Sequence, residues 1–129
     1  MSTIKTNTLT GTTSAGSILV TGEGGSTTTN LQQGLAKSWI TFTSSSSFTN
    51  RDSFNVSTLT DAGAGSATIT MTNVMSNIYH SVQATSNDNN CHAGSGNHTT
   101  ADYQNFSKNS SHSLADATSQ YGSVHGDLA

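Results

Sequence analysis

The chain has 129 residues and a formal net charge of −3 with histidine neutral, and 9% of its residues are charged while 31% are apolar. No apolar run approaches the length that crosses a membrane, and the four basic residues are too scattered to form a surface for nucleic acid. A single cysteine, Cys91, excludes a disulfide within the chain. Serine and threonine are abundant and proline is absent, which favours a β protein with a polar exterior and a thin core.

A thin core gives a small domain little stability, because burial only narrowly exceeds the conformational entropy that folding costs. Small domains of this kind are stabilised by disulfides, metals or oligomerisation, and here we expect self-association. The N-terminal residues lack the apolar core of a signal peptide, which predicts synthesis in a cytoplasm without export by the usual route.

Residues 1–37 are predicted to form an extended attachment arm with one or two short strands. Their single apolar patch, at 17–20, is followed by a glycine-rich polar stretch, and the arm has too few apolar residues to fold alone. Near its end, “TTTNLQQGLAK” predicts a brief helical turn that Thr29 or Asn30 caps and that Gly34 limits.

Residues 38–129 are predicted to form the head domain. Its first strand, at 38–43, places Ile40 and Phe42 on one face and Trp39 on the other. Residues 44–52 are expected to form a loop. The clearest signal in the chain follows at 53–75, where two alternating segments flank the turn residues 61–65 and predict a β-hairpin.

In this hairpin Phe54 and Val56 alternate along the first strand, and Ala67, Ile69 and Met71 share one face of the second. After it, residues 77–85 are predicted to form a strand, with Ile78, His80 and Val82 on one face and Tyr79 on the other. Residues 86–103 are expected to form a long polar loop, residues 103–107 a short strand and residues 119–129 a terminal strand.

Several short strands at regular spacing indicate an all-β fold, a small antiparallel β-sandwich that is jelly-roll-like. Its predicted core consists of the apolar residues that alternate along these strands: Ile40, Phe42, Phe54, Val56, Ile69, Met71, Ile78 and Val82.

Five histidines are the most evident candidates for chemistry: His80, His92, His98, His112 and His125. Cys91, His92 and His98 lie close in sequence with Asp88 nearby, but their spacing matches no common zinc motif. We therefore predict no metal ligand, no cofactor-binding residue and no catalytic residue. A metal shared between copies on an oligomer axis is the alternative, because symmetry multiplies one ligand into several.

No motif in the sequence indicates catalysis. Serines are so frequent that their presence is uninformative, and no G-x-S-x-G nucleophile elbow occurs. Glu23 is the only glutamate and the aspartates are dispersed, so a carboxylate pair for glycoside hydrolysis has little support. The aromatic side chains either pack in the core and rim, which we favour, or form a sugar-binding face by ring stacking: Tyr79, Tyr103, Tyr121 and Trp39.

Four segments occur in a characteristic order: “STIKTNTLTG”, “LQQGLAKSWITF”, “RDSFNVSTLTDAGAGSATITMTNVMSNIYHSV” and “GSVHGDLA”. Together they resemble a family of small marine bacteriophage proteins that are described as tail-fibre or other virion structural proteins. The resemblance covers nearly the whole chain, and its most specific parts are “SFNVSTLTD” in the hairpin and the closing “GDLA”. Residues 85–117 do not match the family pattern. The resemblance implies a virion component and brings no catalytic residues with it.

The resemblance predicts a non-enzymatic virion structural protein, made in the host cytoplasm, whose residues 1–37 attach a fibre or appendage subunit to other virion proteins. By analogy with fibrous phage appendages we expect a homotrimer, with residues 121–125 as its contact and His125 either near the axis or in solvent. The alternatives are a capsid decoration protein, or a receptor-binding module whose loops at 85–113 contact host-surface glycans. A glycan-cleaving enzyme is the alternative from another class, and the dispersed carboxylates argue against it.

Overall fold

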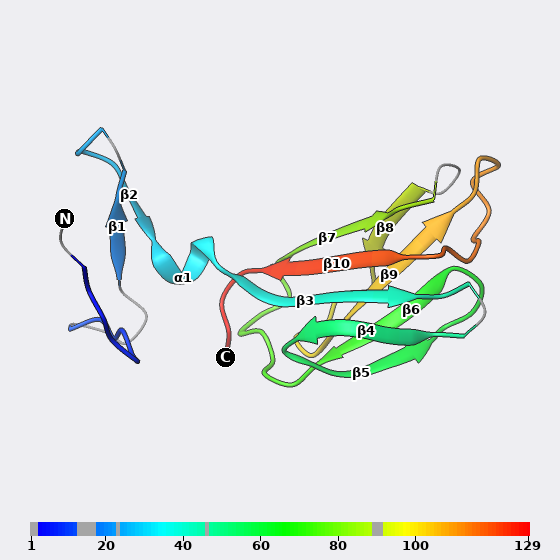
Figure 1. Cartoon of the computed structure of the whole chain (residues 1–129), viewed down its shortest axis with the longest axis horizontal. Coiled ribbons are helices and arrows are strands. Elements are labelled where there is room, and N and C mark those ends of the chain that lie inside the picture. The colour runs from blue at the N-terminus through cyan, green and yellow to red at the C-terminus, as the bar shows by residue number, and fades with distance from the viewer. Residues whose placement is uncertain (1–2, 13–17, 23, 46, 89–91) are drawn as a thin grey trace. The chain divides into compact units, whose positions relative to one another are not determined.

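The computed structural model describes residues 3–12, 18–22, 24–45, 47–88 and 92–129. Its contacts divide the chain into two units, Met1–Leu35 and Ala36–Ala129 (Figure 1).

The first unit contains strands β1 (Leu19–Thr21) and β2 (Thr28–Asn30) and the helical turn α1 (Leu31–Gly34). The strands pair antiparallel as a two-stranded ribbon. Asn30, one of the two predicted caps, begins α1: its Oδ1 accepts hydrogen bonds from the main-chain N–H groups of Gln32 at 2.8 Å and Gln33 at 3.3 Å. None of the described residues up to residue 35 is buried.

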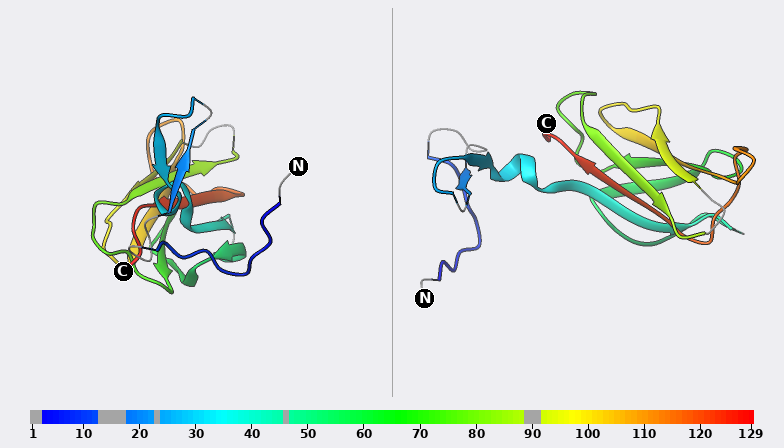
Figure 2. Two further views of the ribbon diagram at one scale, coloured as in Figure 1. Left: turned by 90° about the vertical axis from the view of Figure 1, so that its left-hand side faces the viewer. Right: turned by 90° about the horizontal axis from the view of Figure 1, so that it is seen from above.

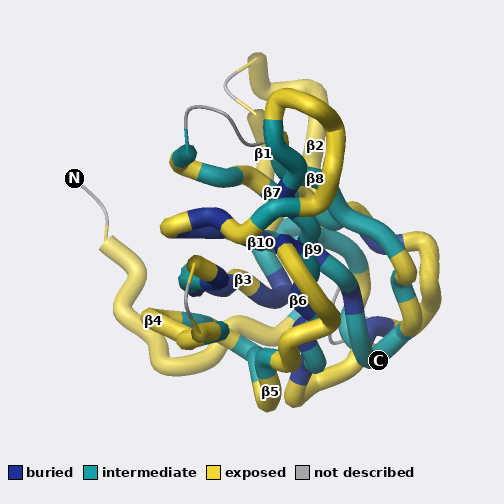
Figure 3. The backbone as a smooth tube through the Cα atoms, turned by 90° about the vertical axis from the view of Figure 1, so that its right-hand side faces the viewer, coloured by how far each residue is buried: buried dark blue, intermediate teal, exposed yellow. Residues whose placement is uncertain are grey.

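The described part of the second unit has these strands: β3 (Ala36–Thr43), β4 (Thr49–Phe54), β5 (Val56–Asp61), β6 (Ser66–Met71), β7 (Ser81–Ser86), β8 (His92–Gly96), β9 (Asp102–Lys108) and β10 (Gln120–His125). They form two antiparallel four-stranded sheets, ordered β4-β3-β10-β7 and β5-β6-β9-β8. Figure 3, which looks along the strands, shows the two sheets as two layers with the buried segments between them. The predicted all-β sandwich is confirmed.

The chain passes from one sheet to the other at Asn55, between β4 and β5. Asn55 has a φ of 56°, a left-handed conformation that asparagine tolerates better than most residues. Its Nδ2 donates to the carbonyls of Lys37 at 2.9 Å and Asn73 at 3.0 Å, and its Oδ1 accepts from the Asn73 N–H at 2.7 Å. The alternation of Phe54 and Val56 therefore belongs to two strands in different sheets, and the prediction of one continuous strand there is wrong.

The predicted hairpin turn is confirmed between β5 and β6. The Asp61 carboxylate accepts a hydrogen bond from the Gly63 N–H at 2.8 Å, and the Ser66 N–H donates to the Gly63 carbonyl at 2.9 Å. Gly63 and Gly65 have φ values of 116° and 64°, which L side chains rarely adopt. Gly65 also lies against the main chain of Ala115, where a Cβ atom would overlap.

The core is confirmed at Ile40, Phe42, Ile69 and Met71, which are buried. Val56 and Val82 are partly buried and pack against this cluster. The cluster also contains Ala67, which was predicted to share a face with Ile69 and Met71, and Tyr103, for which packing was favoured. Its members Met75 and Val124 were not predicted.

Two predicted core residues are exposed, Phe54 by 54% and Ile78 by 52%. Phe54 ends β4 opposite Trp39, on the outer face of its sheet. Ile78 precedes β7, which begins at Ser81, so residues 77–80 do not share the alternation of the strand.

Two segments predicted as loops contain strands. Residues 49–52 belong to β4, and His92–Gly96 form β8 within the predicted loop 86–103. Strand β8 has no large apolar side chain, but its neighbour β9 supplies one. Gly94 lies opposite Phe106, whose ring occupies the space that a Cβ atom of Gly94 would need. The apolar side chain that packs over β8 therefore belongs to β9, which is why the sequence of β8 alone does not predict a strand.

The predicted terminal strand, β10, lies inside a sheet. It pairs with β3 along one edge and with β7 along the other, and it runs beside β3 in Figure 2. Both rows of its main-chain groups are therefore used within the chain. A contact between copies through residues 121–125 would have to use outward side chains and could not use strand pairing.

Replacing Ile69 by alanine tests the placement of the core. The Ile69 side chain is fully buried, so we expect Ile69→Ala to lower the free energy of unfolding by about 2–5 kcal/mol. The matched control is Ile78→Ala, which removes the same atoms from an exposed side chain and should cost less than about 1 kcal/mol. Urea denaturation measures both, and equal losses would contradict the core described here.

Candidate functional site

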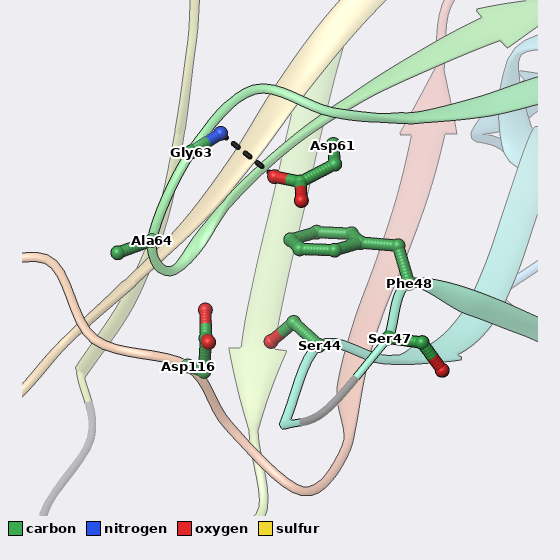
Figure 4. A pocket seen from close by; sticks show the side chains of 7 residues that line it. All are labelled: Ser44, Ser47, Phe48, Asp61, Gly63, Ala64 and Asp116. Atoms are coloured by element: carbon green, nitrogen blue, oxygen red, sulfur yellow. Dashed lines mark hydrogen bonds between the residues drawn. The ribbon is translucent and has the colours of Figure 1, made fainter.

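A small hollow lies at the end of the sandwich beside the β5–β6 turn (Figure 4). Its volume is about 100 Å³, and the residues that line it come from three loops and the end of β5: Ser44, Ser47, Phe48, Asp61, Gly63, Ala64 and Asp116. The structure thus brings together two aspartates, Asp61 and Asp116, that are 55 positions apart (116 − 61) in the sequence. No sequence pattern predicted that these two aspartates lie close together.

Both carboxylates of this hollow have structural partners. Asp61 accepts from the Gly63 N–H, and Asp116 accepts from the Gly65 N–H at 2.6 Å. The two acids therefore hold the same turn from opposite sides. A hollow of about 100 Å³ is also well below the roughly 300–1,000 Å³ of pockets that enclose drug-sized ligands. The arrangement explains how the turn is fixed, and it offers little room for a substrate.

The histidines form two stacked pairs. The ring centroids of His80 and His98 are 5.3 Å apart, and those of His92 and His112 are 5.9 Å apart. His92 and His98, which lie close in sequence, therefore belong to different pairs. Cys91 and Glu23 lie outside the described residues. Among the residues that are described, no group of three or more potential ligands could hold a metal ion.

The His80–His98 pair joins the connection before β7 to the connection before β9. His80 is 7% exposed, and its Nδ1 lies 3.1 Å from the carbonyl oxygen of Asn77. The Nε2 atoms of both rings are buried and have no partner in the described structure. Burial lowers the pKa of His98, and the neighbouring His80 lowers it further. His98 therefore favours its uncharged state.

The four aromatic residues considered as a sugar-binding face lie in different places. Tyr103 is fully buried in the core, and its burial raises the pKa of the phenol to about 12. Tyr79 is 89% exposed on the connection before β7. Trp39 on β3 and Tyr121 on β10 remain exposed by 37% and 39%, on the outer face of the sheet β4-β3-β10-β7. The packing interpretation is thus correct for Tyr103, while Trp39 and Tyr121 share a face.

Comparisons with protein-family models, curated proteins and solved structures found no match to this chain. Among the described residues, no helix is long and apolar enough to cross a membrane.

The lowered pKa of His98 predicts that acid destabilises the fold. A histidine whose pKa is lowered by folding binds its proton more readily in the unfolded chain. The contribution of uncharged His98 to the free energy of unfolding is therefore fully present above about pH 6.5, the pKa of an unperturbed histidine. It is lost as the pH falls from there through the lowered pKa of His98. Melting temperatures measured between pH 8 and pH 5 should show this decline.

The variant His98→Gln should melt with a weaker dependence on pH over that range, because it removes the titrating group. Replacement of the exposed His112 by glutamine is the control and should keep the pH dependence of the parent chain. A His98→Gln variant with the same acid destabilisation as its parent would contradict this assignment.

Proposed function

We propose that this chain is a non-enzymatic structural subunit of a bacteriophage virion, a fibre or appendage subunit that attaches to other virion proteins through its N-terminal unit, which ends at Leu35 and not at residue 37 as expected from the sequence. The resemblance of its sequence to marine bacteriophage virion proteins supports this proposal. So does the division of the chain into a short N-terminal unit and a sandwich whose strands begin at Ala36.

The observation that carries the proposal is the exposure of the N-terminal unit. Its apolar side chains Ile4, Leu9, Leu19 and Val20 are exposed by 86%, 59%, 61% and 49%. A two-stranded ribbon of three-residue strands is not stable in water without packing against something else. These side chains need a covering surface. Under this proposal another virion protein, or further copies of the chain, cover them.

The sandwich itself fits a structural role in salt water. Its strands expose many serine and threonine hydroxyls, and charged side chains are few. Salt screens charges over a few ångströms at high ionic strength, so a surface of neutral hydroxyls keeps its properties where ion pairs weaken. A subunit that only assembles needs this stability and needs no reactive group.

We further propose that the subunit is a homotrimer, as fibrous appendages commonly are. The exposed apolar residues of the N-terminal unit are better placed for this contact than β10, because β10 is already paired on both edges. A capsid decoration protein would use the same attachment. Imaging of particles tagged at Ala129 distinguishes the two positions on the virion.

Deletion of residues 1–35 tests whether the N-terminal unit is needed for assembly and not for folding of the sandwich. The deletion keeps all of β3, so we expect a folded sandwich with a cooperative melt, reduced to a monomer in sedimentation and no longer incorporated into particles. Loss of the β signal on deletion would mean that the N-terminal unit belongs to the fold.

A full-length variant tests whether loss of incorporation comes from the exposed apolar side chains and not merely from shortening the chain. Replacement of Leu19 and Val20 by serine should abolish incorporation and leave the melting temperature unchanged, since both side chains are exposed. The matched control, Thr28→Ser on the partner strand, should assemble normally. Normal incorporation of the Leu19/Val20 variant would contradict the proposed attachment.

A further inference from the structure

Three exposed aromatic side chains are contiguous on the outer face of the sheet β4-β3-β10-β7. Phe54 on β4 lies directly opposite Trp39 on β3. Trp39 lies opposite Ser123 on β10, and Tyr121 is two residues from Ser123, so Trp39 and Tyr121 are diagonal neighbours. Diagonal neighbours on one face are within reach of aromatic side chains. Phe54, Trp39 and Tyr121 therefore cross the sheet as one strip.

A shallow depression of about 160 Å³ continues the strip on its far side. It is lined by residues of β7 and β10: Gln83, Thr85, Tyr121, Gly122 and Ser123. Gln83 lies opposite Ser123 and Thr85 lies opposite Tyr121, so amide and hydroxyl groups stand beside the Tyr121 ring. We call this surface, from Phe54 through Trp39 and Tyr121 to Gln83, Thr85 and Ser123, the aromatic strip.

The polar side chains of the aromatic strip have no hydrogen-bond partner among the residues that the structure describes. In the part of the chain that the structure describes, Gln83, Thr85 and Ser123 make no side-chain hydrogen bond, and neither does the Tyr121 hydroxyl. Elsewhere on the sandwich comparable side chains are engaged, as in the bond between Asn97 and Gln104 at 2.6 Å. The strip thus presents aromatic faces beside unoccupied neutral donors and acceptors.

The charge of the strip selects among ligands. None of its members is charged. The nearest basic residue along β4, Arg51, donates to the Ser119 hydroxyl at 2.7 Å and the Thr118 carbonyl at 3.2 Å, so its guanidinium is held toward the loop before β10. Asp52, on the same strand, lies opposite Thr41 and contributes a negative charge near the margin. An acidic ligand such as a phosphate or sulfate would therefore be repelled by Asp52 and would find Arg51 already hydrogen-bonded within the sandwich.

We propose that the aromatic strip binds a neutral oligosaccharide. The C–H face of a sugar ring carries partial positive charge and stacks on the negative face of an aromatic ring. The hydroxyl groups at the rim of the same sugar ring need neutral donors and acceptors, which Gln83, Thr85 and Ser123 provide. This inference goes beyond the proposed structural role, and it places sugar contact on the sheet face and not on the loops at 85–113.

The depression and the strip suit different parts of such a ligand. A volume of about 160 Å³ is below the roughly 300–1,000 Å³ of pockets that enclose whole drug-sized ligands. One ring can enter the depression beside Tyr121 while following rings lie across Trp39 and Phe54. A linear chain of several sugars fits this shape better than a single sugar does.

Tryptophan fluorescence tests the inference directly, because Trp39 is the only tryptophan in the chain. Full-length protein is titrated with cellohexaose, maltohexaose and chitohexaose, and with an oligogalacturonate as the acidic comparison. We expect a saturable emission shift with at least one neutral hexasaccharide and none with the acidic one. No shift with any of the three neutral sugars, or a shift with the acidic sugar alone, would overturn the proposal.

Variants locate the binding surface. Tyr121→Ala should weaken binding at least about tenfold, equivalent to 1.4 kcal/mol, while Tyr121→Phe keeps the stacking ring and most of the affinity. The control Tyr79→Ala removes an exposed tyrosine outside the strip and should bind within about twofold of the parent chain. If Tyr121→Ala lowers the melting temperature, Gln83→Ala replaces it and should weaken binding severalfold. Equal weakening by Tyr79→Ala would overturn the location.

Another copy of the chain could also occupy this surface in place of a sugar. Sedimentation of the same variants distinguishes these two occupants. The proposal requires Tyr121→Ala to keep the oligomeric state of its parent, and a smaller assembly would mean that the strip is a subunit interface. The titrations use purified protein and do not depend on particle incorporation. Absence of sugar binding in these titrations would therefore not contradict the proposed virion role. Failure of a variant to enter particles would likewise not contradict the sugar site.

Discussion

The side-chain amide of Gln120 connects the two sheets through buried hydrogen bonds. From β10 its Nε2 donates to the Ser107 hydroxyl of β9 at 3.1 Å and to the Ser44 hydroxyl after β3 at 3.0 Å. All three residues are buried. Buried polar groups cost free energy unless they are hydrogen-bonded, so the two bonds of Nε2 favour the strand arrangement in which they form, while the Gln120 Oε1 is buried without a partner in the described structure.

The same network positions the connection that leads into β10. The Ser44 hydroxyl donates to the Ala117 carbonyl at 3.2 Å and accepts from the Ala117 N–H at 3.0 Å, and the Ser107 hydroxyl donates to the Ala115 carbonyl at 2.5 Å. Between Ala115 and Ala117, Asp116 accepts from the Gly65 N–H of the β5–β6 turn. The buried amide is thereby coupled to the turn at the end of the sandwich.

The part of the fold that follows from local alternation could be predicted from sequence. The β5–β6 turn, the inward face of β6 and the cap at Asn30 were recognisable because each depends on residues within a few positions. The division at Asn55 was not, since its conformation depends on hydrogen bonds to Lys37 and Asn73. Strand β8 and the aromatic strip were missed for the same reason, because their apolar side chains come from strands distant in sequence.

A double-mutant cycle between Gln120 and Ser107 tests the central role of the buried amide most directly. Unfolding free energies are measured for Gln120→Met, Ser107→Ala, the double variant and the parent chain, so that losses unrelated to the pair cancel. The account predicts a coupling energy of about 1 kcal/mol, typical of a net hydrogen bond, with Gln120→Met itself destabilising. Strictly additive losses, together with a Gln120→Met variant as stable as its parent, would show that the Gln120 amide does not hold the two sheets together.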